Sequence, residues 1–156
     1  MNVNLLFKTS FFLTLLSVLF FTSCSKKENK KIDIEYQKKL NATKKYYPFE
    51  SWLEAFNNGL DQYTPANCSK ASDIFDELIS GLVEIGKNAP EKEKVELFKK
   101  AVLALNDLNM RTGHRLIETG EAEQLWELIN QISIASGIDP TKYGGGEGLA
   151  SKWRDW

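Results

Sequence analysis

The spacing of apolar residues, which recur every three to four positions, is the sequence feature that most constrains the fold. Proline and glycine divide this pattern into segments, and none of them shows the alternation of apolar and polar residues that is typical of a strand. Each segment would place its apolar side chains along one side of a helix, and such a side must be buried against other helices. We therefore expect an all-α domain over residues 48–156, built as a small antiparallel or orthogonal bundle of four to five helices.

Two helices are expected in the first half of this domain. Pro48 suits the first turn of one helix, and the break at residues 64–67 precedes a second, for which Ser69 or Ser72 is the expected cap. The first helix would bury Phe49, Trp52, Leu53, Phe56, Leu60 and Tyr63. The second would bury Ala71, Ile74, Phe75, Leu78, Leu82 and Ile85.

Two longer helices are expected to follow. Pro90 would start the third helix, which runs to about Arg111, and Thr119 would cap the fourth, which ends at Gly137 as a left-handed cap. The third would bury Val95, Phe98, Ala101, Val102, Leu105 and Leu108, and the fourth Leu125, Trp126, Ile129 and Ile132. The glycines at 144–148 lack the Lys-Ser/Thr of a phosphate loop, so they predict a flexible loop. A short last helix would place Leu149, Trp153 and Trp156 on one side.

The residues before this domain read as a targeting segment followed by a tether. Lys8 precedes an apolar run, and only 14 uncharged residues lie between Ser10 and Ser23, whereas a transmembrane helix needs about 20 apolar residues. Residues 1–23 are therefore expected to be an export signal that is removed from the mature protein. The sequence Phe21-Thr22-Ser23-Cys24 resembles the lipobox of bacterial lipoproteins, with Phe21 where an aliphatic residue is usual.

This resemblance implies that Cys24 is acylated and anchors the chain to a membrane. Several acyl chains hold a protein stably, whereas one holds it only marginally. Ser25, in place of an Asp after the cysteine, is similar to lipoproteins that move on to the outer membrane. Residues 24–47 would then be the tether. Ile32, Tyr36, Leu40, Thr43 and Tyr47 recur at helical spacing, so part of the tether either docks on the body as a helix or folds when something covers it.

Charge and cysteine content limit the classes of partner and chemistry. Residues 25–45 carry eight lysines against three acidic residues, a net charge of +5, while residues 46–156 carry eleven basic against eighteen acidic residues, a net charge of −7. The acidic body lacks the basic face that binding to nucleic acid requires. With Cys24 acylated, Cys68 has no cysteine to pair with, and we interpret it as a small buried residue near a helix start.

No motif points to an enzyme, a metal or a cofactor. The single histidine, His114, has no Gly-x-Ser-x-Gly motif to accompany it, and the chain has neither His-Glu-x-x-His nor a cysteine pair for a metal. Glu118 with His114 is the candidate pair if the protein is a hydrolase of the envelope. We expect no cofactor.

The last four residues, Trp153-Arg154-Asp155-Trp156, are the candidate contact for a partner. Both indoles would either fill the bundle or form an exposed Trp/Arg cluster, the residue types enriched at binding hot spots. With residues 117–121 and 135–137, this ending resembles a family of small helical bacterial proteins classed as a domain of unknown function, over roughly the last 50 residues. Ala122 departs from that pattern, where a basic residue is common. The resemblance implies a helical fold and says nothing about chemistry.

These observations favour a lipoprotein without enzymatic activity whose domain binds a protein of the cell envelope, as an inhibitor or immunity-type factor. Its candidate contact residues are Trp153, Arg154, Trp156 and Glu118. The alternatives are a hydrolase that uses Glu118 or His114, and a structural or assembly subunit that exposes the apolar stripe of residues 32–47.

Overall fold

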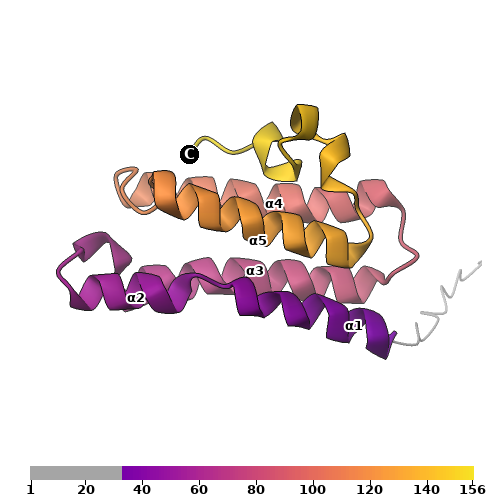
Figure 1. Ribbon diagram of the computed structural model, residues 1–156, viewed down its shortest axis with the longest axis horizontal. Coiled ribbons are helices and arrows are strands. Elements are labelled where there is room, and N and C mark those ends of the chain that lie inside the picture. Colours follow the sequence, from indigo (N-terminus) through magenta and orange to yellow (C-terminus); the bar gives the residue numbers. More distant parts are fainter. Residues whose placement is uncertain (1–32) are drawn as a thin grey trace, which may run out of the picture. The chain divides into compact units, whose positions relative to one another are not determined.

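The computed structural model describes residues 33–156, which form an all-α domain without strands, as expected (Figure 1). Five α-helices follow one another: α1 (Ile34–Asn41), α2 (Phe49–Asn57), α3 (Pro65–Ile85), α4 (Glu91–Arg111) and α5 (Thr119–Ser136). Short 3-10 helices join or follow them: η1 (Ala42–Tyr46), η2 (Asp61–Tyr63), η3 (Pro140–Lys142), η4 (Gly144–Gly146) and η5 (Leu149–Lys152). The expected export signal, Cys24 and the start of the tether lie outside the described residues.

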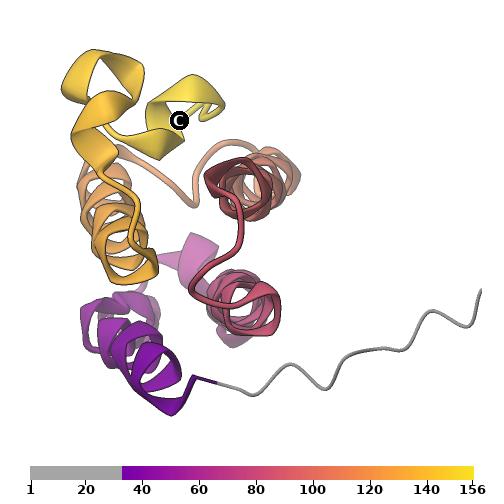
Figure 2. The same cartoon turned by 90° about the vertical axis from the view of Figure 1, so that its right-hand side faces the viewer.

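The helices form a bundle of four rods. α1 and α2 follow each other along one rod, and α3, α4 and α5 are the other three (Figures 1 and 2). Neighbours along the chain run antiparallel, because the turns after α3 and α4 are short. Side chains from every rod meet in one core, whose largest fully buried members include Leu40, Phe75, Phe98, Leu105, Leu125 and Ile132. Among the described residues, no helix combines the length and the apolar character needed to cross a membrane.

The segment from α1 to α2 is docked on the body, which is one of the two outcomes expected for it. Tyr36, Leu40 and Thr43 are buried, and α1 contacts both α3 and α5. Asp76 of α3 fastens the end of this segment, because its Oδ1 accepts a hydrogen bond from the Tyr47 hydroxyl at 2.9 Å and lies 2.8 Å from the Lys44 ammonium. The apolar stripe is therefore covered, and the exposed stripe that would favour an assembly subunit is not present in residues 33–47.

The expected helix 49–63 is wrong in its second half. α2 ends at Asn57, and the chain turns at Asn58 and Gly59, which has a positive φ of 97°. This turn moves Leu60 off the buried side of the helix, so Leu60 is 48% exposed. Leu53, which was also expected to be buried, lies within α2 and is 37% exposed. Tyr63 returns to the core through η2 and packs near Trp52, with 5.7 Å between the ring centroids.

The start of α3 also differs from the expected one. Thr64, rather than Ser69 or Ser72, is the N-cap, and its Oγ1 accepts a hydrogen bond from the Asn67 amide at 3.2 Å. Pro65 is tolerated there because the first helical residue needs no amide hydrogen. Cys68 is buried in the first turn, as predicted, and its burial raises the pKa of the thiol.

α4 and α5 match their expected bounds closely. α4 ends at Arg111, and α5 ends at Ser136 with Gly137 as the left-handed cap. The glycines expected to form a loop instead form the tight turn η4, in which the amides of Gly146 and Gly148 both donate to the Tyr143 carbonyl. The expected last helix is reduced to η5, where Leu149 and Ala150 are buried.

Candidate binding groove

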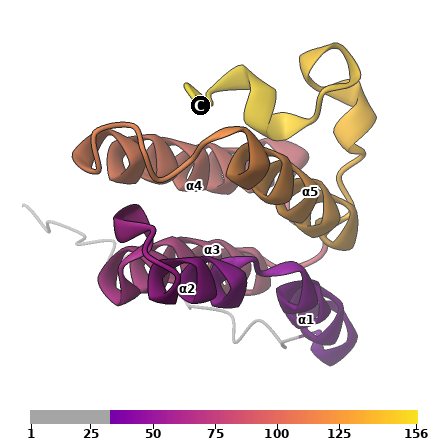
Figure 3. The same cartoon turned by 60° about the vertical axis from the view of Figure 1, so that its left-hand side comes forward.

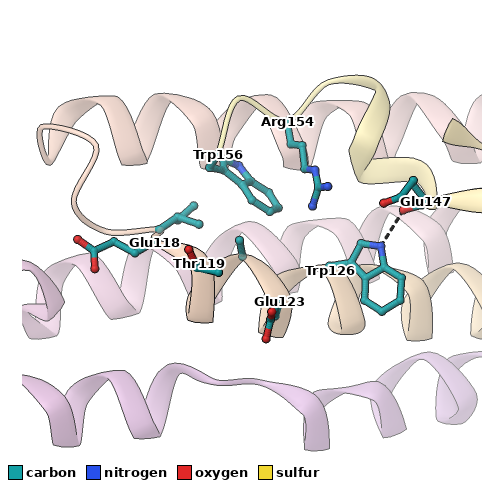
Figure 4. A pocket seen from close by; sticks show the side chains of 9 residues that line it. Glu118, Thr119, Glu123, Trp126, Glu147, Arg154 and Trp156 are labelled. Carbon is teal, nitrogen blue, oxygen red and sulfur yellow. Dashed lines mark hydrogen bonds between the residues drawn. The ribbon is translucent and has the colours of Figure 1, made fainter.

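A groove of about 550 Å³ lies between the first half of α5 and the chain that follows η4 (Figure 4). One wall belongs to α5, and the other belongs to Glu147 and the last residues of the chain, which cross above α5 in Figure 3. The groove is lined by Ile117, Glu118, Thr119, Ala122, Glu123, Trp126, Glu147, Arg154 and Trp156. It therefore brings together residues that are almost 40 positions apart in the sequence.

The wall on α5 is set by the way this helix begins. Glu118 is the N-cap, with extended backbone, and its amide donates to Oε2 of Glu121 at 3.2 Å in a capping box. The expectation that the Thr119 hydroxyl would cap the helix is therefore wrong, because the cap is the preceding residue, Glu118, with its carboxylate. Thr119 is the first helical residue instead, and its side chain faces the groove.

The opposite wall is held in place by a close contact at Gly148. A Cβ built on this residue would lie 2.3 Å from Oδ1 of Asn130 on α5, so only glycine allows the chain to approach so closely. Beyond it, Nδ2 of Asn106 donates to the Trp153 carbonyl at 2.8 Å. These two contacts, on α5 and α4, position Arg154 and Trp156 above the start of α5.

Trp126 joins the two walls. Its indole N–H donates to the Glu147 carbonyl at 2.7 Å. We expected Trp126 in the buried stripe of its helix, but it is half-buried and lines the groove, while Leu125, Ile129 and Ile132 are buried as predicted. An indole needs an acceptor for its N–H, and here the acceptor is on the far wall rather than in the apolar core.

Among the described residues, Arg154 is the only cationic one that lines the groove. It is half-buried, and its guanidinium lies 5.7 Å from the centroid of the Trp156 ring, a cation–π contact. Within residues 33–156 it forms no ion pair, and its side chain donates no hydrogen bond to another residue. Figure 4 shows it pointing into the groove between Trp156 and Trp126, whereas the carboxylates of Glu118 and Glu123 point away.

Three of the four residues proposed from the sequence meet in this groove: Glu118, Arg154 and Trp156. Trp153 does not line it, since its ring packs against the core and under the Lys152 ammonium. Glu123, Trp126 and Glu147 were not predicted from the sequence as site residues. One side of α5 carries Thr119, Glu123 and Trp126, as their spacing requires. This side could not be recognised as an apolar stripe, because it contains both polar and apolar residues.

The residues considered for a hydrolase are not brought together in the groove. Glu118 lines it, but His114 lies in the exposed turn after α4 and is not part of the lining. His114 has a positive φ of 59°, and its amide donates to the Asn109 carbonyl at 2.9 Å, which closes the end of α4. In the described part of the chain, no cluster of His, Cys, Asp and Glu side chains is arranged to hold a metal ion.

Comparison with known proteins gives no relatives: no protein-family model, no characterised protein and no solved structure matches this chain.

Proposed function

We propose that this protein is a lipid-anchored component of the bacterial cell envelope whose helical domain binds a protein partner through the groove between α5 and the last residues of the chain. The anchoring part of the proposal rests on the sequence of residues 1–24, with acylation of Cys24 and residence in the outer membrane. The binding part rests on the groove, and the partner we favour is an envelope protein that is inhibited or neutralised by this contact.

One observation carries the binding proposal. Two indoles, Trp126 and Trp156, line a single open groove, and an arginine without an ion-pair partner in the described chain lies between them. Trp and Arg are enriched among the residues that carry most of the energy of protein interfaces, because they combine a large apolar surface with polar groups. A fully packed core would leave neither half-buried indoles nor an unpaired guanidinium in one place.

The position of the groove also fits a protein partner. The start of α1, where the tether arrives, lies beside Ala135 and Gly137 at the end of α5, whereas the groove lies over the first half of that helix. The 18 residues of α5 span about 27 Å. In an anchored protein, the part of α5 beyond Trp126, about 15 Å long, separates the groove from the tethered end and leaves it accessible to proteins in the aqueous phase.

Site-specific photocrosslinking in the native envelope tests the binding proposal. A photoreactive amino acid at Glu123, in the groove, is compared with the same residue at Glu96, an exposed position on α4 outside it. We expect a discrete adduct from Glu123 only. The purified partner should then bind Trp126→Ala at least about tenfold more weakly than the wild type, as for a hot-spot residue, and its own activity should fall when the wild type is added.

Equal crosslinking from both positions, or unchanged affinity of a folded Trp126→Ala variant, would contradict a binding role for this groove. Loss of affinity without any change in the partner's activity would retain the binding role and reject the inhibitor role.

Mass spectrometry of the protein from its native membrane tests the anchoring proposal separately. We expect a chain that begins at Cys24 and carries acyl groups, and we expect the Cys24→Ser variant to leave the detergent phase. An intact chain with Met1, or an unmodified thiol at Cys24, would reject it.

A further inference from the structure

We propose that the groove recognises a carboxylate side chain, Asp or Glu, that stands next to an apolar residue in an exposed segment of the partner. This inference rests on the proposed binding function and specifies its chemistry. Arg154 would be the contact for the carboxylate, and Trp126 and Trp156 would be the contacts for the apolar neighbour.

The polarity of the groove interior is the first argument. Although three of its lining residues are glutamates, the carboxylates of Glu118 and Glu123 point away from the space between the walls, whereas the Arg154 guanidinium points into it (Figure 4). Arg154 is therefore the positive charge that a bound side chain meets inside the groove, and Glu147 on the wall is the carboxylate that competes for it. The exposed acidic residues at its edge would disfavour partners that carry many negative charges, such as nucleic acids.

The hydrogen-bonding capacity of Arg154 is the second argument. Its guanidinium lies 5.7 Å from the centroid of the Trp156 ring, and no described carboxylate or carbonyl accepts a hydrogen bond from it. A cation–π contact uses up none of the N–H donors, so they remain available to bind a carboxylate through two parallel hydrogen bonds. A half-buried cation beside two indoles strengthens such bonds, because the surroundings contain less water.

The apolar walls are the third argument. Ile117, Ala122, Trp126 and Trp156 supply most of the lining that is not charged, and the Trp126 ring is held by its bond to the Glu147 carbonyl. This bond fixes the ring before a partner arrives, so less conformational entropy is lost on binding. A carboxylate that reaches Arg154 would place a neighbouring aliphatic or aromatic side chain against these rings.

Peptide titrations followed by NMR test the inference on the whole chain with Cys24→Ser. The probes are four acetylated tetrapeptides: Ala-Glu-Phe-Ala amide, the Gln and Lys versions of that amide, and Ala-Gln-Phe-Ala with a free terminal carboxylate. The indole N–H signals of Trp126 and Trp156, assigned from Trp→Phe variants, report occupancy. We expect saturable shifts of both signals with the Glu peptide and roughly tenfold weaker binding of the Gln peptide.

Three variants sharpen the test. Arg154→Gln should abolish the preference for Glu over Gln, while Arg115→Gln, which removes an exposed charge outside the groove, should leave it unchanged. Glu147→Gln should strengthen binding of the Glu peptide, because it removes a competing carboxylate from the wall and leaves the backbone carbonyl that holds Trp126.

Several results would overturn the inference. They are equal or tighter binding of the Gln or Lys peptide, binding of the terminal carboxylate alone, weaker binding to Glu147→Gln, and absence of saturable shifts at millimolar peptide. If any of these occurs while the crosslinked partner still requires Trp126, the inference fails and the proposed function stands. If the partner does not require Trp126, the proposed function fails as well.

Discussion

At the scale of single residues, Lys94 is the side chain whose environment departs most from its type. Although it is a lysine, it is only 6% exposed, and its ammonium donates to the carbonyls of Lys87 at 2.7 Å and Ser136 at 2.8 Å. These carbonyls lie just after α3 and at the end of α5, where backbone acceptors lack partners within their helices and a cation is favourable. Burial lowers the pKa of Lys94, but the two bonds tie two helix ends to α4.

Replacing Lys94 with Met tests this role. Met fills a similar volume but leaves the buried Ser136 carbonyl and the partly buried Lys87 carbonyl without this donor, and a lost bond of this kind costs about 1 to 3 kcal/mol. We expect the free energy of unfolding to fall by about 2 to 4 kcal/mol in urea denaturation, since removal of the buried charge offsets part of the cost. Lys92→Met, at an exposed position on the same helix, should change it by less than about 0.5 kcal/mol. Equal effects of the two changes would show that the bonds of Lys94 contribute nothing.

The residues that the sequence predicts well are those whose chemistry agrees with their surroundings. Cys68 is apolar and buried, and Gly137 caps a helix, as their types suggest. Lys94 and Trp126 could not be predicted in the same way. Lys94 lies four residues before Phe98 on the buried side of α4, but a charged residue is normally assigned to solvent. Trp126 is apolar and was assigned to the core, because its acceptor comes from a distant segment.

At the scale of elements, α1 is the helix whose stability depends most on its neighbours. It has only 8 residues, too few for a helix to be stable alone, so its structure depends on burial of Tyr36 and Leu40. Leu40→Ala should lower the free energy of unfolding by about 2 to 5 kcal/mol, measured by denaturation. Ile34→Ala, at a position 65% exposed in the same helix, should have almost no effect. A small effect of Leu40→Ala would mean that α1 is not part of the cooperative unit.

The cap of α3 gives a second test at this scale, because the sequence and the structure assign it differently. Thr64→Ala removes the acceptor for the Asn67 amide and should cost about 1 kcal/mol of stability in thermal or urea unfolding. Ser69→Ala and Ser72→Ala, the caps expected from the sequence, should be neutral or slightly stabilising, because Ala is favourable inside a helix. If Ser69→Ala or Ser72→Ala lowered the stability more than Thr64→Ala, the helix would begin at the serine, as the sequence suggested.

The elements themselves were largely predictable, and their ends were less so. Long helices such as α4 and α5 have several turns of consistent spacing, so their identity and their carboxyl ends were correct. Thr64-Pro65 was read as a break, although proline at the first helical position is compatible with a helix. Spacing also could not indicate that α2 ends at Asn57, because Leu60 continues the apolar pattern beyond the turn.

At the scale of the whole molecule, the groove depends on contacts that only the complete fold provides. Its two walls come from α5 and from residues after Gly146, and their separation is set by the Gly148–Asn130 approach. Glu118, Arg154 and Trp156 could be identified from the sequence by residue type, but the sequence contains no information about the distances between them. This is why residues of both walls were predicted as candidates while the groove itself was not.

The pH dependence of unfolding is a property of the whole molecule that follows from its tyrosines. The pKa values of Tyr36, Tyr47 and Tyr63 are raised mainly by burial, and the hydrogen bond to Glu91 raises that of Tyr143 to about 12. In the unfolded chain these hydroxyls lose their protons near pH 10, before they do so in the folded protein, so their stabilising contribution is complete below pH 10 and is lost as the pH rises beyond it. The lowered pKa of Lys94 has the opposite effect, because it makes the folded state more favourable as the pH rises, but it is one group against four tyrosines.

We therefore expect the free energy of unfolding, measured in urea, to fall steadily above pH 10, while ultraviolet absorbance reports tyrosines that ionise late in the folded state. Tyr47→Phe should be less stable than the wild type at neutral pH, because the bond to Asp76 is lost, and the difference should narrow above pH 10, where the wild type alone loses the contribution of Tyr47. Tyr143→Phe should likewise make the alkaline decline less steep. If the difference in free energy of unfolding between Tyr47→Phe and the wild type stayed constant across this range, Tyr47 would have the same pKa in the folded and unfolded chains. Neither burial nor the bond to Asp76 would then raise that pKa.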